Sequence, residues 1–449
     1  MAPWGAAIGT LEFGAPVGSA NARLAITEVL NLFINCRGAG SGSISLYGQV
    51  GKQMRSKSNQ RVSLRNSGVA AGCALFAAVV GGWTVSAGQS VASQPMWVNS
   101  SSTARMQDDS AARLNAIEKA MSFLDGQQAE DGSFSSQAGT APTAMVVSSM
   151  LRNGRDVSHP VVSKALEFLL QNVQADGGIY QEKSTHRNYE TAIAVVALAD
   201  VGGEKYKKEI AAADKFLRRL QWDEEEQKEE DDMFYGGAGY GSHTRPDLSN
   251  TSFMVDALKA AGAEDDDPDL QKALVFISRC QNHESPANKT AFATTGPKDG
   301  GFFYTAAAGG ESKAGVMEGN PQGLRSYGSM TYAGLKSLLY AGVKKDDSRV
   351  QAAMTYLQQH YDLDANPGMG AQGLYYYYHI FGKSLDALGE ETFTTADGKK
   401  HDWRAELVSE LVERQQENGS WLNTESDRWM EGDPNLVTSY ALLALSYTK

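Results

Sequence analysis

Two short polar clusters in this 449-residue sequence hold the side chains most able to take part in chemistry. The first cluster holds His186, Arg187, Tyr189 and Glu190, and the second holds His243, Arg245, Asp247 and Asn250. A carboxyl group close to histidine and tyrosine can act as a general acid or base. The acids of these two clusters, Asp247 and Glu190, are the candidate catalytic residues. The simpler alternative is that Asp247 only caps the helix that follows it.

Two further segments extend the candidate ligand-binding set. One contains Arg325 and Tyr327, and the other is the aromatic run 375–379, which contains Tyr376 and His379. Arginine binds anionic groups well, so the three arginines predict a polar rim for an anionic or hydroxylated ligand. The aromatic rings could stabilise a cation, stack on a sugar, or only pack neighbouring helices.

All four segments lie at or before the start of one phrase that recurs six times. The phrase is a Thr, a small residue six positions later, a Leu or Met next, and a Gly four positions further on. Its first residues are Thr143, Thr191, Thr251, Thr331, Tyr378 (with Tyr in place of Thr) and Thr438, where the chain ends before the Gly. A regular internal repeat of this kind predicts a helical array.

Each repeat contains two helical halves joined by a Gly-rich turn. The first half carries charges on one face and ends near a Gln, as in Phe216-Leu217 with Gln221, which suits an outer, solvated helix. The second half is the phrase itself, which is apolar and ends at a Gly that accepts a left-handed C-cap. We predict an all-α fold over residues 112–449, an α/α toroid of about six hairpins with a double ring of inner and outer helices.

The long segments 222–246 and 282–328 come before inner helices, so we expect them at one mouth of the ring. The N-terminal ends of the inner helices would face the same mouth, where their dipoles favour a negatively charged or oxygen-rich ligand.

The first hundred residues do not belong to the array. A basic segment from Met54 and the apolar run 69–85 are typical of a signal peptide, so we assign 54–93 to a signal peptide or N-terminal anchor. Residues 1–53 are a doubtful extension and residues 94–111 a linker. We expect export to the periplasm or cell envelope, with membrane contact only through an uncleaved anchor.

Composition narrows the possible partners. The formal net charge of −12 argues against nucleic acid. The seven histidines form no H-x-H or H-E-x-x-H pair, and the acidic runs match no EF-hand, so we expect neither a metal nor a cofactor. Past residue 93 the chain contains only Cys280, which permits no disulfide within that part.

A Gln followed by Gly-x-aromatic before an apolar inner helix resembles the Gln-Trp repeats of squalene–hopene and related terpenoid cyclases. Protein prenyltransferases contain similar hairpins. In class II cyclases the motif Asp-x-Asp-Asp stands directly before the equivalent Thr, and its central acid protonates an alkene. Here only Glu190 and Asp247 occupy a slot of that motif, in different repeats. The resemblance therefore implies the toroid without the protonating motif, and the prenyltransferase zinc ligands are not matched either.

Two hypotheses follow. The first is an exported ligand-binding or scaffold toroid without class II cyclase chemistry, which binds a small molecule such as an isoprenoid or a glycan. The alternative is an enzyme: a divergent terpenoid cyclase that uses Asp247 or Glu190 alone, or a glycan-active toroid that uses histidine and tyrosine. An apolar cavity with a buried acid would favour the cyclase, and a shallow cleft lined by Arg, His and Tyr would favour the glycan. The sequence does not predict an oligomeric state.

Overall fold

The computed structural model describes residues 100–241 and 244–449, with side chains from residue 110 onward. The doubtful extension 1–53, the predicted signal 54–93 and the candidate residue His243 lie outside the described residues. The description below concerns the compact unit that contains the repeats, Gln94–Lys449.

Helices make up most of this unit and alternate between two layers. The outer helices are α3 (Ser100–Asp125), α5 (Pro160–Gln171), α7 (Lys207–Arg218), α9 (Pro268–Arg279), α12 (Ser348–Gln359) and α14 (Trp403–Arg414). The inner helices are α4 (Ala141–Arg152), α6 (Arg187–Val201), α8 (Leu248–Ala260), α11 (Gly328–Tyr340), α13 (Leu374–Leu388) and α15 (Pro434–Ser446). Helix α3 begins inside the segment 94–111 that we assigned to a linker, since no Gly or Pro interrupts it between Ser100 and Asp125.

The remaining elements are short. They are α10 (Ala291–Thr295), the 3-10 turns η1 (Ser136–Ala138), η2 (Glu224–Glu226) and η3 (Arg428–Met430), and the antiparallel pairs β1 (Val316–Met317) with β2 (Asn320–Leu324) and β3 (Phe393–Thr394) with β4 (Lys400–His401).

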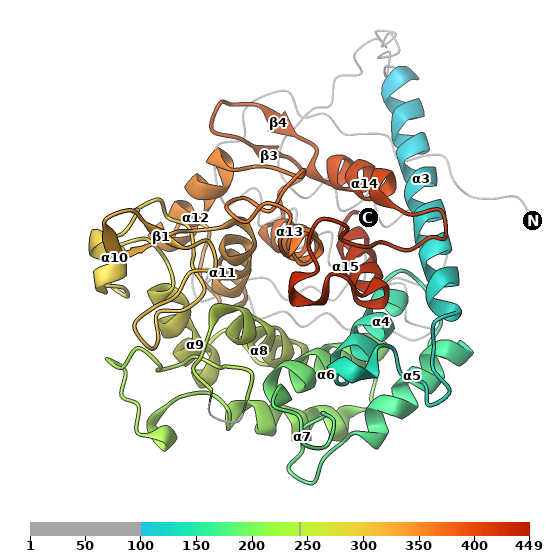
Figure 1. The fold of residues 1–449 in the computed structure, drawn as a ribbon, viewed down its shortest axis with the longest axis horizontal. Helices are drawn as coiled ribbons and strands as arrows, with labels where there is room; N and C mark the ends of the chain where they lie inside the picture. Colours follow the sequence, from blue (N-terminus) through green and yellow to red (C-terminus); the bar gives the residue numbers. More distant parts are fainter. Residues whose placement is uncertain (1–99, 242–243) are drawn as a thin grey trace, which may run out of the picture. The chain divides into compact units, whose positions relative to one another are not determined.

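The inner helices form a closed ring. Each one packs against the next along the chain, and α15 returns to pack against α4 (Figure 1). Most residues of an inner helix are buried, as in α11, whereas an outer helix such as α5 buries one stripe. The predicted all-α toroid with inner and outer helices is therefore confirmed.

In the five repeats where the phrase begins with Thr, that Thr connects the preceding turn to its inner helix. The backbone N–H of Phe134 donates to Thr143 Oγ1 at 2.9 Å, and Trp421 donates to Thr438 Oγ1 at 3.1 Å. Thr191, Thr251 and Thr331 accept from their turns in the same way. A buried N–H without a partner is costly, so the repeated Thr has a structural role.

In four repeats the Gln before the turn connects one repeat to the next. Gln281 Nε2 donates to the carbonyl of Gly300 in its own turn and to that of Arg349 in the following outer helix. Gln415, in the last repeat, donates in the same way to Ala116 of α3 at 2.8 Å, which closes the outer ring. The turn glycines pass so close to the next helix that a Cβ on Gly236 would lie 1.8 Å from the Lys272 carbonyl oxygen.

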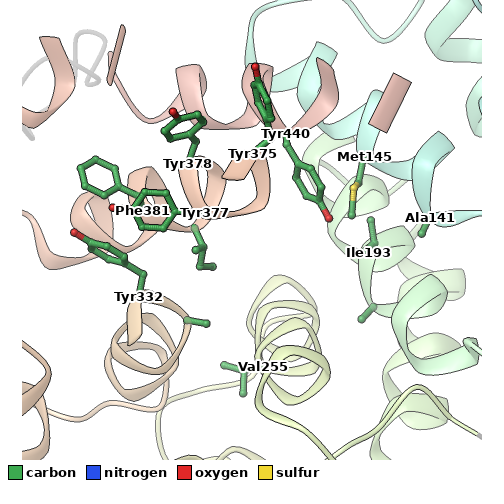
Figure 2. Close-up of a cluster of buried hydrophobic side chains, with 14 of the residues drawn as sticks. Ala141, Met145, Ile193, Val255, Tyr332, Tyr375, Tyr377, Tyr378, Phe381 and Tyr440 are labelled. Carbon is green, nitrogen blue, oxygen red and sulfur yellow. The ribbon is translucent and has the colours of Figure 1, made fainter. Parts of the chain in front are cut away.

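Three positions of the phrase line the interior of the inner ring, which we call the lumen. They are two before, two after and five after the opening Thr, a spacing of i, i+4 and i+7 that places side chains on one face of a helix. The middle position includes Met145, Ile193 and Tyr440, which are labelled in Figure 2. The first position lies near the N-terminal ends of the inner helices and the last nearer their C-terminal ends, so the lumen has two chemically different ends.

Candidate functional site

The N-terminal end of the lumen holds a cavity of about 640 Å³, which we call the main cavity. The position two before the phrase's Thr contributes five lining residues, Tyr189, Ser249, Ser329, Tyr376 and Leu436. The segments predicted to gather at one mouth also reach it, through Tyr240, Tyr304 and Lys313. Every inner helix therefore meets this cavity through its first turns.

Aromatic rings form much of the wall. They are Tyr189, Tyr240, Phe253, Tyr304, Tyr327, Tyr376, Trp429 and Tyr440. Phe253 connects Tyr189, at 5.2 Å between ring centroids, to Tyr376, at 6.1 Å. The remaining tyrosines of the run 375–378 are core residues, and Tyr332, Tyr377 and Phe381 pack together in Figure 2. Because a helix turns about 100° per residue, only Tyr376 of that run lines the cavity.

Glu190 lies in the wall with its carboxylate fully engaged. It accepts hydrogen bonds from the backbone N–H groups of Thr140 (2.7 Å) and Gln181 (3.1 Å) and from the Ser184 hydroxyl. These partners belong to two loops of neighbouring repeats. Glu190 therefore connects these two loops by hydrogen bonds at the mouth of the ring.

Glu431, which the sequence analysis did not select, occupies an equivalent place at α13. Its Oε1 accepts from the backbone N–H groups of Tyr375 (2.8 Å) and Tyr376 (2.9 Å), and its Oε2 accepts from Asn423 Nδ2 at 2.6 Å. Burial raises the pKa of this carboxyl above its ordinary value despite those bonds. The N-terminal N–H groups of α13 are thus occupied by the protein itself.

Asp247 lies behind the wall and is 2% exposed. It caps α8 by accepting from the backbone N–H of Asn250 at 2.9 Å, and it also accepts from the Asn250 side chain at 2.8 Å. Burial raises the pKa of Asp247 to about 6, while hydrogen bonds from Asn250 and Tyr304 act in the opposite direction. Tyr304 lines the main cavity and is therefore the group between Asp247 and the cavity.

The structure brings five of the candidate residues to the main cavity, namely His186, Tyr189, Glu190, Tyr327 and Tyr376. Asp247 and Asn250 lie close behind it, since Asn250 bonds to Asp247 and contacts the Tyr240 phenol. His379 instead lines a second cavity further along the lumen.

None of the three candidate arginines is among the residues that line the main cavity. Arg187 donates to the Ser184 carbonyl and lies over the Tyr180 ring. Arg245 pairs with Glu311, and Arg325 donates to the Val316 carbonyl. The charged lining residues are instead Glu182, Lys183, Glu190, Lys313 and Glu431.

Several lining residues were not selected from the sequence. Phe253 could have been found, because it lies four residues after Ser249 and so shares its helix face. Tyr304, Trp429 and Glu431 come from long segments without a repeat, which offer no periodic signal.

Within the described part of the chain, no group of three or more His, Cys, Asp or Glu side chains is placed to hold a metal ion. The helices described here also include none that is long and apolar enough to cross a membrane.

Comparisons with known proteins give a family match over part of the chain. Residues 136–307 match the model of the squalene-hopene cyclase C-terminal domain. No curated protein matches the sequence.

Among solved structures, the chain is similar to type II terpene cyclase MstE from Scytonema. Two variants of that enzyme in complex with geranylgeranyl dihydroxybenzoate, its substrate, are 13% and 14% identical. Each covers 76% of this chain, and the matches include 99% and 98% of those chains, both with a TM-score of 0.29. TM-scores this low support no conclusion about activity. The family match over residues 136–307 supports the resemblance of this chain to the terpenoid cyclase-like superfamily.

Proposed function

We propose that this toroid binds an apolar, isoprenoid-type small molecule in the main cavity. The observation that carries the proposal is the wall of aromatic rings around about 640 Å³ at the centre of the ring. A concave, mostly apolar site of this size with a few polar groups is typical of small-molecule sites. A purely structural scaffold would have no need of such a space.

The charges around the cavity favour an uncharged or cationic ligand over an anionic glycan. The candidate arginines are directed to other partners, and the carboxylates of Glu190 and Glu431 lie in the wall. The inner-helix N–H groups that could attract an anion already have acceptors at α4, α8 and α13. The anion site expected from helix dipoles therefore has little support.

The acids of the site support binding without alkene protonation. Protonating a carbon–carbon double bond requires a strong carboxylic acid, whereas the raised pKa of Asp247 makes it a weaker one. Glu190 is held by its hydrogen bonds, and the slot of the central catalytic acid holds Tyr189, Ser249, Ser329 and Tyr376 in four repeats.

One observation favours an enzyme as the second candidate. A carboxyl with a pKa of about 6 suits proton transfer near neutral pH. Asp247 could exchange a proton with a polar atom of the ligand through the Tyr304 phenol, with which it shares a hydrogen bond.

A binding assay with geranylgeraniol, a neutral isoprenoid, tests the proposal against tetragalacturonate, an anionic oligosaccharide. We expect geranylgeraniol to bind and to quench the fluorescence of Trp429 at the mouth. Ser249→Phe, which places a large ring in the cavity wall and narrows the cavity, should weaken binding about tenfold or more. Ser348→Phe, on the exposed first residue of α12, is the matched control and should bind normally. Binding of tetragalacturonate alone, or equal binding by both variants, would refute the proposal.

We also propose export, on the basis of the signal-like sequence from Met54. N-terminal sequencing of the protein recovered from the cell envelope should place the mature end near Gly88 or Gln94. A secreted chain that retains residues 1–53 would contradict this proposal.

A further inference from the structure

The other end of the lumen contains a layer of buried charged side chains. They occupy the same position of the phrase, five residues after its first residue, in three consecutive repeats: Asp256, Lys336 and Lys383. Lys336 is 0% exposed, and its ammonium lies 2.5 Å from Asp256 Oδ1. Lys383 lies 2.6 Å from Asp256 Oδ2. A single carboxylate therefore serves two buried ammonium groups.

The wider cluster keeps an excess of one positive charge. Arg152, at the end of α4, pairs with Asp200 at 2.7 Å, so at neutral pH the cluster contains three cations and two carboxylates. Burial lowers the pKa of Lys336 to about 8, which still leaves it mostly charged at pH 7. His379 adds no charge at neutral pH, because burial and the nearby Lys383 hold its pKa well below the ordinary range. The C-terminal ends of the inner helices carry partial negative charge that favours cations here, and the Ser252 carbonyl of α8 accepts from Lys336 at 3.0 Å. Neither supplies the full negative charge that would balance the third cation.

A small cavity of about 40 Å³, the second cavity, opens onto this cluster. It is lined by Arg152, His379 and Lys383 together with Asp256, Ser148 and Tyr447. His379 is 6% exposed, and its Nδ1 has no hydrogen-bond partner among the described residues. The Lys383 ammonium donates to Asp256, which leaves further N–H bonds for an acceptor.

We propose that the second cavity binds one small monovalent anion of halide or formate size, held by Lys383, Arg152 and the His379 ring. The anion would neutralise the excess charge and accept from donors that the protein leaves unused. A volume of about 40 Å³ is enough to admit such an ion. This inference does not depend on the ligand of the main cavity.

Bromide tests the site directly because its position can be found by anomalous diffraction. We expect an anomalous peak in the second cavity of bromide-soaked crystals. In solution, bromide should raise the melting temperature more than gluconate at the same ionic strength, because bromide is the much smaller anion and a ligand that binds the folded chain stabilises it. Peaks confined to the molecular surface, with equal effects of both salts, would mean an adventitious ion only and would overturn the proposal.

Lys383→Met is the informative variant. It removes one donor and the excess charge, while Asp256 keeps Lys336 as its partner. We expect its apparent affinity for bromide to fall about tenfold or more, since hydrogen bonds to a charged group are strong. Lys208→Met, on the exposed face of α7, is the matched control and should respond as the wild type does. A bromide response that survives in Lys383→Met would also overturn the proposal, and if that variant does not fold, the diffraction result on the wild type decides.

Discussion

The two ends of the lumen differ in charge, in space and in the kind of residue that lines them. The N-terminal end is wide and aromatic, with carboxylates at Glu190, Asp247 and Glu431. The C-terminal end is narrow and carries Arg152, Lys336 and Lys383 around Asp256. Because the inner helices all present their N-terminal ends to the main cavity, acids and bases lie where the helix dipoles stabilise them.

This difference indicates that the charges of the two ends have different tasks. At the wide end the carboxylates hold neighbouring loops and helix ends in place, by accepting hydrogen bonds from their backbone N–H groups. At the narrow end the charged side chains pair with one another, and N–H groups of Lys383 remain available to a further acceptor. An apolar ligand suits the first end, and a small anion suits the second.

The largest effect is expected from Asp256→Ala, which would leave Lys336 and Lys383 buried without their carboxylate. Removal of one partner from a buried ion pair costs about 3–5 kcal/mol. We expect urea denaturation to show a loss of that order in the free energy of unfolding. The triple variant Asp256→Ala, Lys336→Met, Lys383→Met should recover most of it. A loss below about 1 kcal/mol in the single variant would mean that the cluster is not a buried charge network.

A smaller loss is expected at the wide end from Glu190→Gln. Both N–H groups, of Thr140 and Gln181, donate to the same oxygen, Oε2, so the amide oxygen of the variant can keep both bonds, but as weaker bonds to an uncharged acceptor. The new NH2 group would face the Ser184 hydroxyl, which donates to Oε1 in the wild type. We expect a loss of about 1–2 kcal/mol in the free energy of unfolding. Glu431→Gln is the matched comparison at α13 and should behave alike. If Glu190→Gln were as stable as the wild type, the carboxylate would not be needed to hold the two loops together, and a catalytic role for Glu190 would regain support.

The fold could be predicted because most repeats need the same hydrogen bonds between their turn and their helices. Thr143 and Thr438 accept a turn N–H in the first and last repeats, and Gln415 repeats the role of Gln281 while closing the ring. These hydrogen bonds recur from repeat to repeat, so the same residue type recurs at the same place in the copies that make them.

The site was less predictable because several of its residues lie in segments that are not part of the repeat. Tyr304 and Glu431 reach the main cavity from long segments without a period. The pairing of Asp256 with Lys336 and Lys383 requires the ring, since these residues are far apart in sequence. The three residues share one position of the phrase, which the sequence shows. That this position faces the lumen follows only from its i, i+4, i+7 spacing with the other lumen-lining positions.

The smallest change is expected from Asp247→Asn, which keeps a capping side chain and removes a buried charge. The pKa of Asp247 rises from 3.8 to about 6 on folding, so the folded chain holds this proton more tightly than the unfolded chain. The contribution of this group to stability therefore falls as pH rises from about 4 to 6. The variant should lack that fall. A pKa change of this size corresponds to about 3 kcal/mol, and loss of the hydrogen bond from Tyr304 offsets part of it, so we expect the variant to be more stable than the wild type at pH 7 by about 1–2 kcal/mol.

Urea denaturation of both proteins between pH 4 and pH 8 measures this difference. The oxygen Asn250 Oδ1, which has no partner among the described residues, can accept the new amide. If the two proteins keep a constant difference across this range, the burial of Asp247 does not perturb its titration.

The most direct test of this account is a crystal structure of the protein grown with geranylgeraniol. We predict electron density for the isoprenoid in the main cavity, against Tyr189, Phe253 and Tyr376, with no part of it bonded to Arg187, Arg245 or Arg325. An empty main cavity at saturating geranylgeraniol, or a ligand bound only on the outer surface, would contradict the assignment of the wide end of the lumen to an apolar ligand.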